Sequence, residues 1–397
     1  MSAEAQFTEA GSTAGATAAG SAAAPAEAPF FPLDGLFKEA ERQLSICNAC
    51  RYCEGLCAVF PALERRTLLS AEDVGQLSNL CHDCRACYDA CMYAPPHEFD
   101  LNLPKALAAV RVADNRRYMW PGTVPRFLRG RLAAAVGIPV VALILLAIAA
   151  GHTGFSGLVA TPPGPGSPYT LIPYPVLLAV AGLPALYAIV VMAVGARRFW
   201  TATGGSPAGL TAGAIRQMVT DAVTLRYLRG GGLGCYYEED DEPSPLRRHL
   251  HSFVSGGFAL CLVSTIAAGV MQDFAGIDPP YPVLSVPVIT GLIGGISLAA
   301  GAAALLLVKT GSSRDTTTEQ MVAKDYAFLT ALLVLAVSGL LTLFTRDTAA
   351  YGIVLVVHLV AVAFTFLSAP YSKFTHFIYR TLALVRDNLE TTGSGTA

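Results

Sequence analysis

Charged residues are scarce in this sequence: Asp, Glu, Lys and Arg make up 14% of its 397 residues, whereas 53% are hydrophobic. A soluble globular protein of ordinary composition carries about 25% charged residues. The shortage is concentrated after residue 130, where long apolar runs begin. The composition therefore excludes an ordinary soluble protein and indicates a chain that lies largely in a lipid bilayer.

The first 28 residues contain no Lys or Arg, and they lack a continuous apolar stretch. A secretory signal needs both a basic start and an apolar core. We therefore expect this segment, rich in Ala, Gly and Ser, to be a disordered tail. The sequence also lacks a GxGxxG segment after a strand. Two-electron flavin chemistry would therefore have to come from another protein.

Six apolar runs are each long enough to cross a hydrocarbon layer, which takes about 20 helical residues. They centre on residues 132–150, 172–194, 253–271, 284–308, 326–344 and 352–369. The loops at 195–248 and 309–325 carry most of the basic residues between the runs, and cytoplasmic loops are enriched in Lys and Arg. We therefore predict a multi-pass protein of the bacterial cytoplasmic membrane, surrounded by lipid, with both termini in the cytoplasm.

Eight cysteines lie in two repeats with the same gaps of two, two and three residues, CNACRYCEGLC at 47–57 and CHDCRACYDAC at 81–91. In two-cluster ferredoxins, three thiolates of such a run bind one [4Fe–4S] cluster and the fourth binds the other. The predicted ligand sets are Cys47, Cys50, Cys53 and Cys91 for one cluster, and Cys81, Cys84, Cys87 and Cys57 for the other. Because protein thiolates fill every position, the clusters should carry electrons and not bind substrate.

Structural zinc and disulfide bonds are the alternatives for these cysteines. Zinc sites usually take thiols in pairs with a long spacer, and disulfide frameworks belong to small secreted chains. A cytoplasmic domain keeps its thiols reduced, which also favours iron–sulfur clusters. Two further cysteines lie outside the repeats: Cys261 is expected to be a small buried side chain in an apolar run, and Cys235 has no predicted role.

Histidines near the ends of the apolar runs suggest haem ligation, because ionisable residues inside a membrane are costly and often functional. His358 lies inside the last run, and His376 follows eighteen residues later, about five helical turns or ~27 Å along one helix. One helix could therefore supply a ligand to a haem near each membrane surface. Pro370 lies between the two histidines and can end the helix.

The partner of His376 must lie at the cytoplasmic end of another helix, where His251 is the candidate and His249 its competitor. Gly256 and Gly257 could let a porphyrin approach the backbone there. For His358, the candidate on the outer side is His152. The alternative is that these histidines make ordinary hydrogen bonds between helices or at helix ends.

These patterns predict an all-α membrane protein, in which an α-helical ferredoxin-type domain with two [4Fe–4S] clusters precedes a bundle of six transmembrane helices. The expected divisions are a tail at 1–28, the cluster domain at 29–118, an interfacial linker at 119–131, the membrane domain at 132–380 with its cytoplasmic loop at 195–248, and a C-terminal tail at 381–397.

From about residue 43 to its C-terminus, the chain resembles the tricarballylate and citrate utilization protein B family. The two cysteine repeats, PYPVLSVPV at 280–288 and HLVAVAFTFLSAPYSKFTHFIYR at 358–380 carry the resemblance. It implies a membrane electron-transfer subunit with haem b. A partner dehydrogenase with FAD would oxidise a tricarboxylate, and this subunit would pass the electrons to quinone. By position, the eight repeat cysteines match the family's cluster ligands, and His251, His358 and His376 match its membrane histidines.

The sequence departs from that family pattern at two places. The family doubles the histidine at the third span, where this chain has Ser252 after His251, and it has another near that span's outer end, where this chain has Gln272. One haem is therefore expected, and a second, outer haem stays open. The acidic run at 238–242 could dock the partner or be a solvated surface.

Other functions are compatible with the sequence. They are a six-helix transporter with a cytoplasmic iron–sulfur redox sensor, an electron-transfer partner in cobalamin synthesis, and a self-contained quinone reductase. Full cysteine ligation of both clusters disfavours the last. We expect no substrate catalysis by this chain alone and no nucleic-acid partner.

Overall fold

The computed structural model describes residues 33–121, 131–162, 167–205, 211–232, 234–236 and 242–393. The predicted tail at 1–28, most of the linker at 119–131 and most of the acidic run at 238–242 lie outside these ranges. Within them the chain is helical, and its one extended pairing is a bridge between Cys235 and Ser244. The structure therefore confirms the predicted all-α class.

The N-terminal domain contains α1 (Leu33–Cys50), α2 (Val59–Glu64), α3 (Ala71–Leu80), α4 (Ala86–Asp89) and α5 (Leu103–Tyr118). A capping box begins α3, because the Ser70 hydroxyl accepts from the Asp73 backbone N–H and the Asp73 carboxylate accepts from the Ser70 N–H. Helices α1, α3 and α5 bury Leu44, Leu77 and Leu107 between them. This packing fixes the ends of α1 and α3, where the cysteine loops begin.

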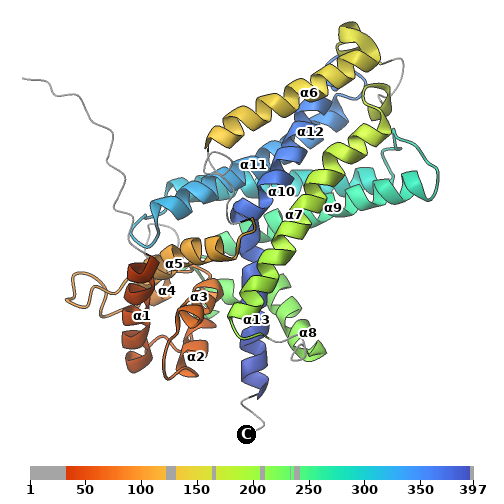
Figure 1. Ribbon diagram of the computed structural model, residues 1–397. Helices are drawn as coiled ribbons and strands as arrows, with labels where there is room; N and C mark the ends of the chain where they lie inside the picture. Colours follow the sequence, from red (N-terminus) through yellow and green to blue (C-terminus); the bar gives the residue numbers. More distant parts are fainter. Residues whose placement is uncertain are drawn as a thin grey trace, which may run out of the picture.

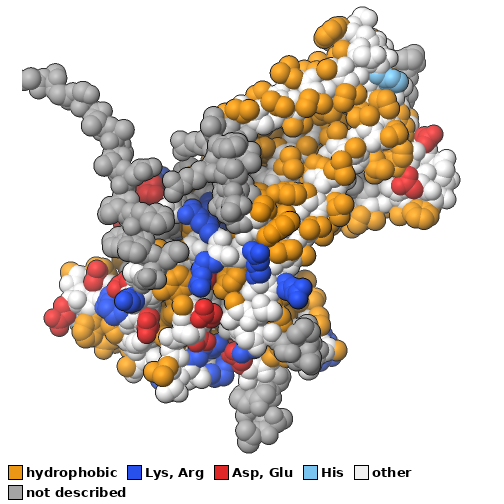
Figure 2. Space-filling view, in the orientation of Figure 1, with side chains coloured by type: hydrophobic (Ala, Val, Ile, Leu, Met, Phe, Trp, Pro, Cys, Tyr) orange, Lys and Arg blue, Asp and Glu red, His pale blue; other side chains and the backbone are white. Residues whose placement is uncertain are grey.

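Six long apolar helices follow: α6 (Arg131–Leu158), α7 (Tyr174–Ala202), α9 (Leu246–Asp273), α10 (Val286–Thr310), α11 (Glu319–Phe344) and α12 (Tyr351–Ser368). Each is long and apolar enough to cross a membrane, which confirms the six predicted spans. Figure 2 shows a mainly hydrophobic surface over this bundle, with Lys and Arg gathered where it meets the N-terminal domain. Two shorter elements, α8 (Ala212–Val223) and η4 (Arg226–Gly232), lie between α7 and α9.

Helices α9 and α10 pack closely through glycines. A Cβ atom added to Gly257 would lie 2.5 Å from the backbone nitrogen of Leu298, and one added to Gly294 would lie 2.8 Å from the backbone nitrogen of Cys261. Small residues at facing positions let two helix backbones approach within van der Waals contact. This pair therefore forms a tight unit within the bundle.

The helix that contains His358 does not continue to His376. Helix α12 ends at Ser368, two 3₁₀ turns span Ala369–Thr375, and α13 (His376–Gly393) begins at the histidine itself. Pro370 lies in the first of these turns, where its ring and missing N–H end the α-helical ladder. The two histidines therefore lie on separate helices, so the single helix considered above is not formed.

The predicted C-terminal tail at 381–397 is wrong for its described part, because residues 381–393 complete α13. This helix packs against α3, α7 and α8, and Figure 1 shows it beside the N-terminal domain. Tyr379 and Ala383, one turn apart, are buried in that domain's core together with Leu384. The prediction ended the folded chain at residue 380, soon after the last membrane-length apolar run, because a search for such runs does not detect a polar helix with a single apolar stripe.

Candidate cluster and histidine sites

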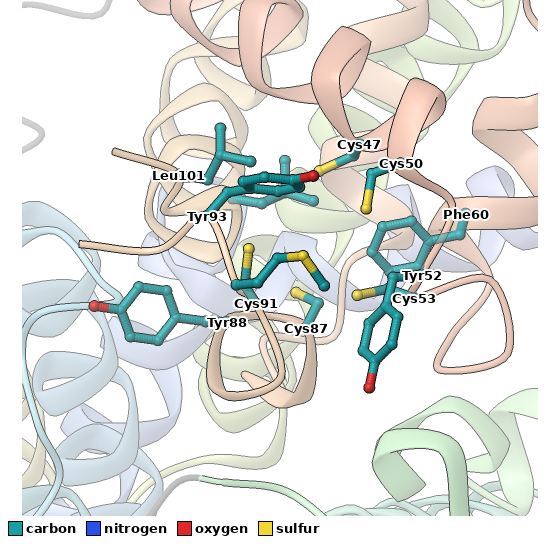
Figure 3. A pocket seen from close by; sticks show the side chains of 12 residues that line it. Cys47, Cys50, Tyr52, Cys53, Phe60, Cys87, Tyr88, Cys91, Tyr93 and Leu101 are labelled. Atoms are coloured by element: carbon teal, nitrogen blue, oxygen red, sulfur yellow. The ribbon is translucent and has the colours of Figure 1, made fainter. Parts of the chain in front are cut away.

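The first group of thiols surrounds a hollow between α1 and the loop after α4. Figure 3 shows the sulfur atoms of Cys47, Cys50, Cys53, Cys87 and Cys91 around it. Aromatic and aliphatic side chains complete the lining: Tyr52, Phe60, Tyr88, Met92, Tyr93, Leu101 and Leu103. Cys50 is exposed, whereas the other thiols are partly covered. This hollow therefore opens to the surface of the domain.

The second group lies deeper, where Cys57, Cys81, Cys84 and Cys87 line a hollow against α5. Cys81 and Cys84 are buried. Backbone N–H groups at the start of α2, from Val59 and Phe60, donate to the Cys57 sulfur. Hydrogen bonds to sulfur are one of the means by which a protein sets the reduction potential of a bound cluster. Cys87 lines both hollows, so the two groups adjoin.

Both cysteine loops hold non-glycine residues in the left-handed backbone region. The φ angles are 57° at Arg51, 54° at Asp83 and 66° at Arg85. Such angles are uncommon for non-glycine residues and cost roughly 1–3 kcal/mol each. The surrounding fold holds these sharp reversals, which turn the thiols inward.

The thiols shift one another's protonation in the predicted crossed grouping. Burial raises the pKa of Cys47 to about 12, and Cys91, Cys53 and Cys50 add to the effect. Burial also raises the pKa of Cys57, with further contributions from Cys84 and Cys81. Assembled thiolates therefore repel unless cations join them, and metal binding would displace the protons.

The spacing of the thiols along the chain favours clusters over single metal ions. In the described ranges, no three Cys, His, Asp or Glu side chains converge closely enough to hold a single metal ion. Zinc bound in tetrahedral geometry needs thiolates about 2.3 Å from one ion. A cubane instead binds each thiolate at a separate corner. The arrangement fits a cluster better than the zinc alternative.

A glycine-rich loop from the membrane domain contacts Leu56 and Cys84, two residues that line the second hollow. The Tyr236 N–H donates to the Cys84 carbonyl over 2.9 Å, and Cys235 is buried in the same apolar group as Cys84. Gly231, with φ of 78°, lies so close to Leu56 that an added Cβ would be 2.8 Å from its Cδ2. Sequence reasoning gave Cys235 no role; the signal that could have placed this loop is the run RGGGLG, which permits close approach.

The structure brings His251 and His376 together, at the starts of α9 and α13. Their ring centroids lie 6.3 Å apart, with an angle of 83° between the ring planes. The Nδ1–H of His376 donates to the Lys373 carbonyl, which leaves Nε2 free to accept. The buried Nδ1 of His251 has no hydrogen-bond partner among the described residues. The competitor, His249, is exposed.

Ion pairs hold the turn before His376. The Asp325 carboxylate of α11 pairs with Lys373 and also with Lys309 of α10, which lies 2.5 Å from it. The carboxylate is buried between the two ammonium groups. Together the three residues join two membrane helices to the 3₁₀ turn and thereby fix the start of α13.

The two glycines expected to admit a porphyrin differ in their surroundings. Gly256 has no atom within 4 Å of an added Cβ, so it has open space beside it. Gly257 instead packs against Leu298 of α10. Its predicted role in porphyrin approach is therefore wrong, since a neighbouring helix fills that space.

The outer histidines are not brought together. Nδ1 of His358 lies 3.0 Å from the Ser338 hydroxyl of α11, and its ring packs on Gly339. His152 is exposed on α6, and no ring contact joins it to His358 in the described structure. His358 thus makes a hydrogen bond between helices, the alternative considered from sequence.

Comparisons with known proteins agree with the resemblance described above. The family model "Citrate utilization protein B" matches residues 127–397, and "Citrate utilization protein B Fer4-like domain" matches residues 40–117. Citrate utilization protein B of Escherichia coli is 40% identical over 353 residues, covering 89% of this chain and 92% of that protein. No solved structure matches. The chain therefore belongs to the citrate utilization protein B family, as a membrane protein with a ferredoxin-like N-terminal domain.

Proposed function

We propose that this protein carries electrons from a soluble FAD-dependent dehydrogenase to quinone in the membrane. The observation that carries the proposal is the succession of the three sites. The first thiol group opens at Cys50, the second lies deeper and shares Cys87, and the loop of Cys81 contacts the helix that begins with His376. When bound, two [4Fe–4S] clusters would supply one-electron carriers at the thiol groups.

The thiol groups meet the requirements of such clusters. Each offers four sulfurs in the crossed arrangement, and the residues around them exclude much of the water. Because Cys50 reaches the surface, a soluble partner can approach the first group. Cys81 and Cys84 are buried, and Cys84 packs in one apolar group with Leu228 and with Val308 of α10, so the second group suits transfer towards the bundle.

The pair of His251 and His376 fits axial ligation of a haem b. Their ring centroids lie 6.3 Å apart. Two imidazoles that lie this close, from the starts of two different helices, would hold the haem iron, which would supply a one-electron carrier when bound. A backbone carbonyl that holds Nδ1–H, as at His376, is the usual support for a ligating histidine. We propose one haem, because His358 lacks a facing histidine.

The partner and its substrate are inferred from the family. The similar Escherichia coli protein is named for citrate utilization, which supports a tricarboxylate as the substrate of the dehydrogenase. The basic residues at the junction in Figure 2 support a cytoplasmic position for the cluster domain, where a soluble dehydrogenase can reach it. The quinone would bind near the histidine pair.

Membranes containing this protein and its flavoprotein partner test the function. They should reduce quinone when tricarballylate or citrate is added, and Cys84→Ala should abolish that activity. Cys261→Ala, which changes a thiol on α9 outside both groups, is the matched control and should retain it. Reoxidation of the flavoprotein at the same rate with and without this protein would contradict the proposal and favour a sensor-transporter.

An absorbance spectrum tests the haem independently of the partner. The purified protein should show reduced b-type bands after dithionite, and His376→Ala should abolish the low-spin spectrum while iron–sulfur signals remain. His249→Ala, a change two residues from His251 at an exposed position, should leave the spectrum unchanged. A low-spin spectrum that survives in both His251→Ala and His376→Ala would refute this ligand pair.

A further inference from the structure

Two arginines from distant parts of the chain meet at the carbonyl of Cys81. Arg111 of α5 donates from Nη2 to that oxygen over 2.8 Å and from Nε to the Ser78 carbonyl over 2.7 Å. Arg380 of α13 donates from Nη2 to the same oxygen over 2.6 Å and from Nε to the Asn79 carbonyl over 3.2 Å. The loop that begins the second cysteine repeat is therefore held from two sides.

A third arginine holds the same loop from the membrane domain. Arg247 of α9 donates from Nη1 to the Asp83 carbonyl over 2.5 Å. Arg247 precedes His251 by four residues, and Arg380 follows His376 by four residues. Residues four apart lie on one face of a helix. Each of the two helices that carry the histidine pair thus contacts the cysteine loop one turn away from its histidine.

Arg111 and Arg380 place positive charge beside this loop, where the Asp83 carboxylate offsets part of the charge of Arg380. Arg111 is buried, and neither Arg111 nor Arg380 forms an ion pair in the described ranges; the hydrogen bonds that they donate here go to backbone carbonyls. Carbonyl oxygens satisfy N–H groups but carry no net charge. A buried cation without a counterion is costly. Four thiolates around a cluster would supply the missing negative charge beside it.

We infer that Arg247 and Arg380 are positioning residues, which tie the loop of the second cluster to the two helices of the histidine pair and, with Arg111, raise that cluster's reduction potential. The inference rests on the proposed function. Reduction adds one electron to an already anionic site, and a fixed buried cation stabilises the reduced form more than the oxidised form. No bond forms or breaks, and the guanidinium groups keep their protons throughout.

An anaerobic redox titration with dithionite as the electron donor, followed by electron paramagnetic resonance on the purified full chain, tests the inference. In Arg380→Gln, the potential of one cluster should fall by about 59 mV, a tenfold change in its one-electron equilibrium. Iron, acid-labile sulfide and the low-spin haem spectrum should stay at wild-type levels. Arg380→Lys, which keeps the charge but cannot reach both carbonyls, should recover part of the shift.

The matched control is Arg386→Gln on the same helix, since Arg386 pairs with Glu390 and the Gly204 carbonyl instead of the cysteine loop. In Arg386→Gln, the reduction potentials of both clusters should equal those of the wild-type protein. Wild-type potentials for both clusters in Arg380→Gln would overturn the inference. If Arg380→Gln loses iron, Arg111→Gln is titrated instead. The potential of one cluster should fall by the same amount in Arg111→Gln. An unchanged potential in Arg111→Gln would overturn the inference. A wild-type protein without iron–sulfur signals would instead overturn the proposed function.

Discussion

At the scale of single residues, Asp114 is the most unusual charge in the cluster domain. Its carboxylate is fully buried, with an exposure of 0%, and an added Cβ on Gly75 would lie 2.6 Å from it. Burial raises the pKa of Asp114 to about 7, against the lowering effect of Arg117, whose Nη1 lies 3.5 Å away. The folded protein therefore keeps this proton to a higher pH than the unfolded chain does.

This shift predicts a stability that falls as the pH rises. The unfolded carboxyl loses its proton near pH 4 and the folded one near pH 7, so stability declines across that window and stays low above it. Asp114→Asn should remove the decline and stabilise the protein at pH 8 by on the order of 2–4 kcal/mol. Thermal unfolding at pH 5 and pH 8 measures the effect. Asp100→Asn, at an exposed position, is the control; a steeper decline in Asp114→Asn would contradict the explanation.

The ten cysteines should divide into those that bind cluster iron and those that do not. Cys50→Ala removes a predicted ligand of the exposed thiol group and should remove or convert one cluster. Cys235→Ala changes a thiol that is buried beside Cys84 but belongs to neither group, and it should retain about eight irons. Iron and acid-labile sulfide analysis of anaerobic preparations distinguishes the two variants. Equal iron loss in both would show that Cys235 is a ligand.

At the scale of helices, the pairing of α9 with α10 determines where His251 lies. Gly257 and Gly294 let the two backbones meet, and Ser297 of α10 donates from its hydroxyl to the Phe253 carbonyl of α9 over 2.9 Å. The contact begins less than two turns after His251. Any separation of these helices would therefore move that imidazole relative to His376.

Two adjacent glycines make this packing testable. Gly257→Ala places a methyl group against the Leu298 backbone and should destabilise the bundle by roughly 1–3 kcal/mol, as overpacking does. Gly256→Ala meets open space and should be neutral or stabilising by up to about 1 kcal/mol, because Ala favours helices over Gly. Thermal unfolding midpoints compare the variants. Equal midpoints would mean that the helices do not pack this closely.

At the scale of the whole molecule, the N-terminal domain and α13 form one unit. Arg65 and Arg66, at the end of α2, pair with Asp387 and Glu390 of α13. The Arg66 side chain has an exposure of 9%, so solvent screens this contact little. The cluster domain is therefore completed by residues that lie beyond the last membrane helix.

Neutralising both acidic partners should loosen this unit. The double variant Asp387→Asn, Glu390→Gln leaves Arg65 without a counterion and leaves Arg66 with Asp73 alone, at a cost of about 1–3 kcal/mol for the partly buried site. Hydrogen exchange in residues 59–80 should speed up, while exchange in α10 stays unchanged. The double variant Glu319→Gln, Asp347→Asn, in exposed ion pairs, is the control. Unchanged exchange in residues 59–80 would show that the ion pairs contribute nothing to the unit.

The sequence predicted the features that depend on local spacing. The gaps within each cysteine repeat anticipated the two thiol groups, and membrane-length apolar runs anticipated six helices. The packing of α13, the neighbour of Gly257 and the position of Cys235 were not predictable in this way. Each depends on contacts between segments far apart in the chain, and nothing in the spacing of nearby residues reports which distant helix will fill a given space.

The contact between the end of α2 and α13 also determines when the cysteine domain can finish folding during synthesis. Arg66 and Glu390 are separated by 324 positions, so the ribosome makes all six membrane-length helices between them. N-terminal domains generally fold first during synthesis. Here the cysteine domain lacks the packing of α13 until all six membrane helices have been made. The domain's core, which includes Tyr379 and Ala383 of α13, can therefore close only after those helices have been synthesised.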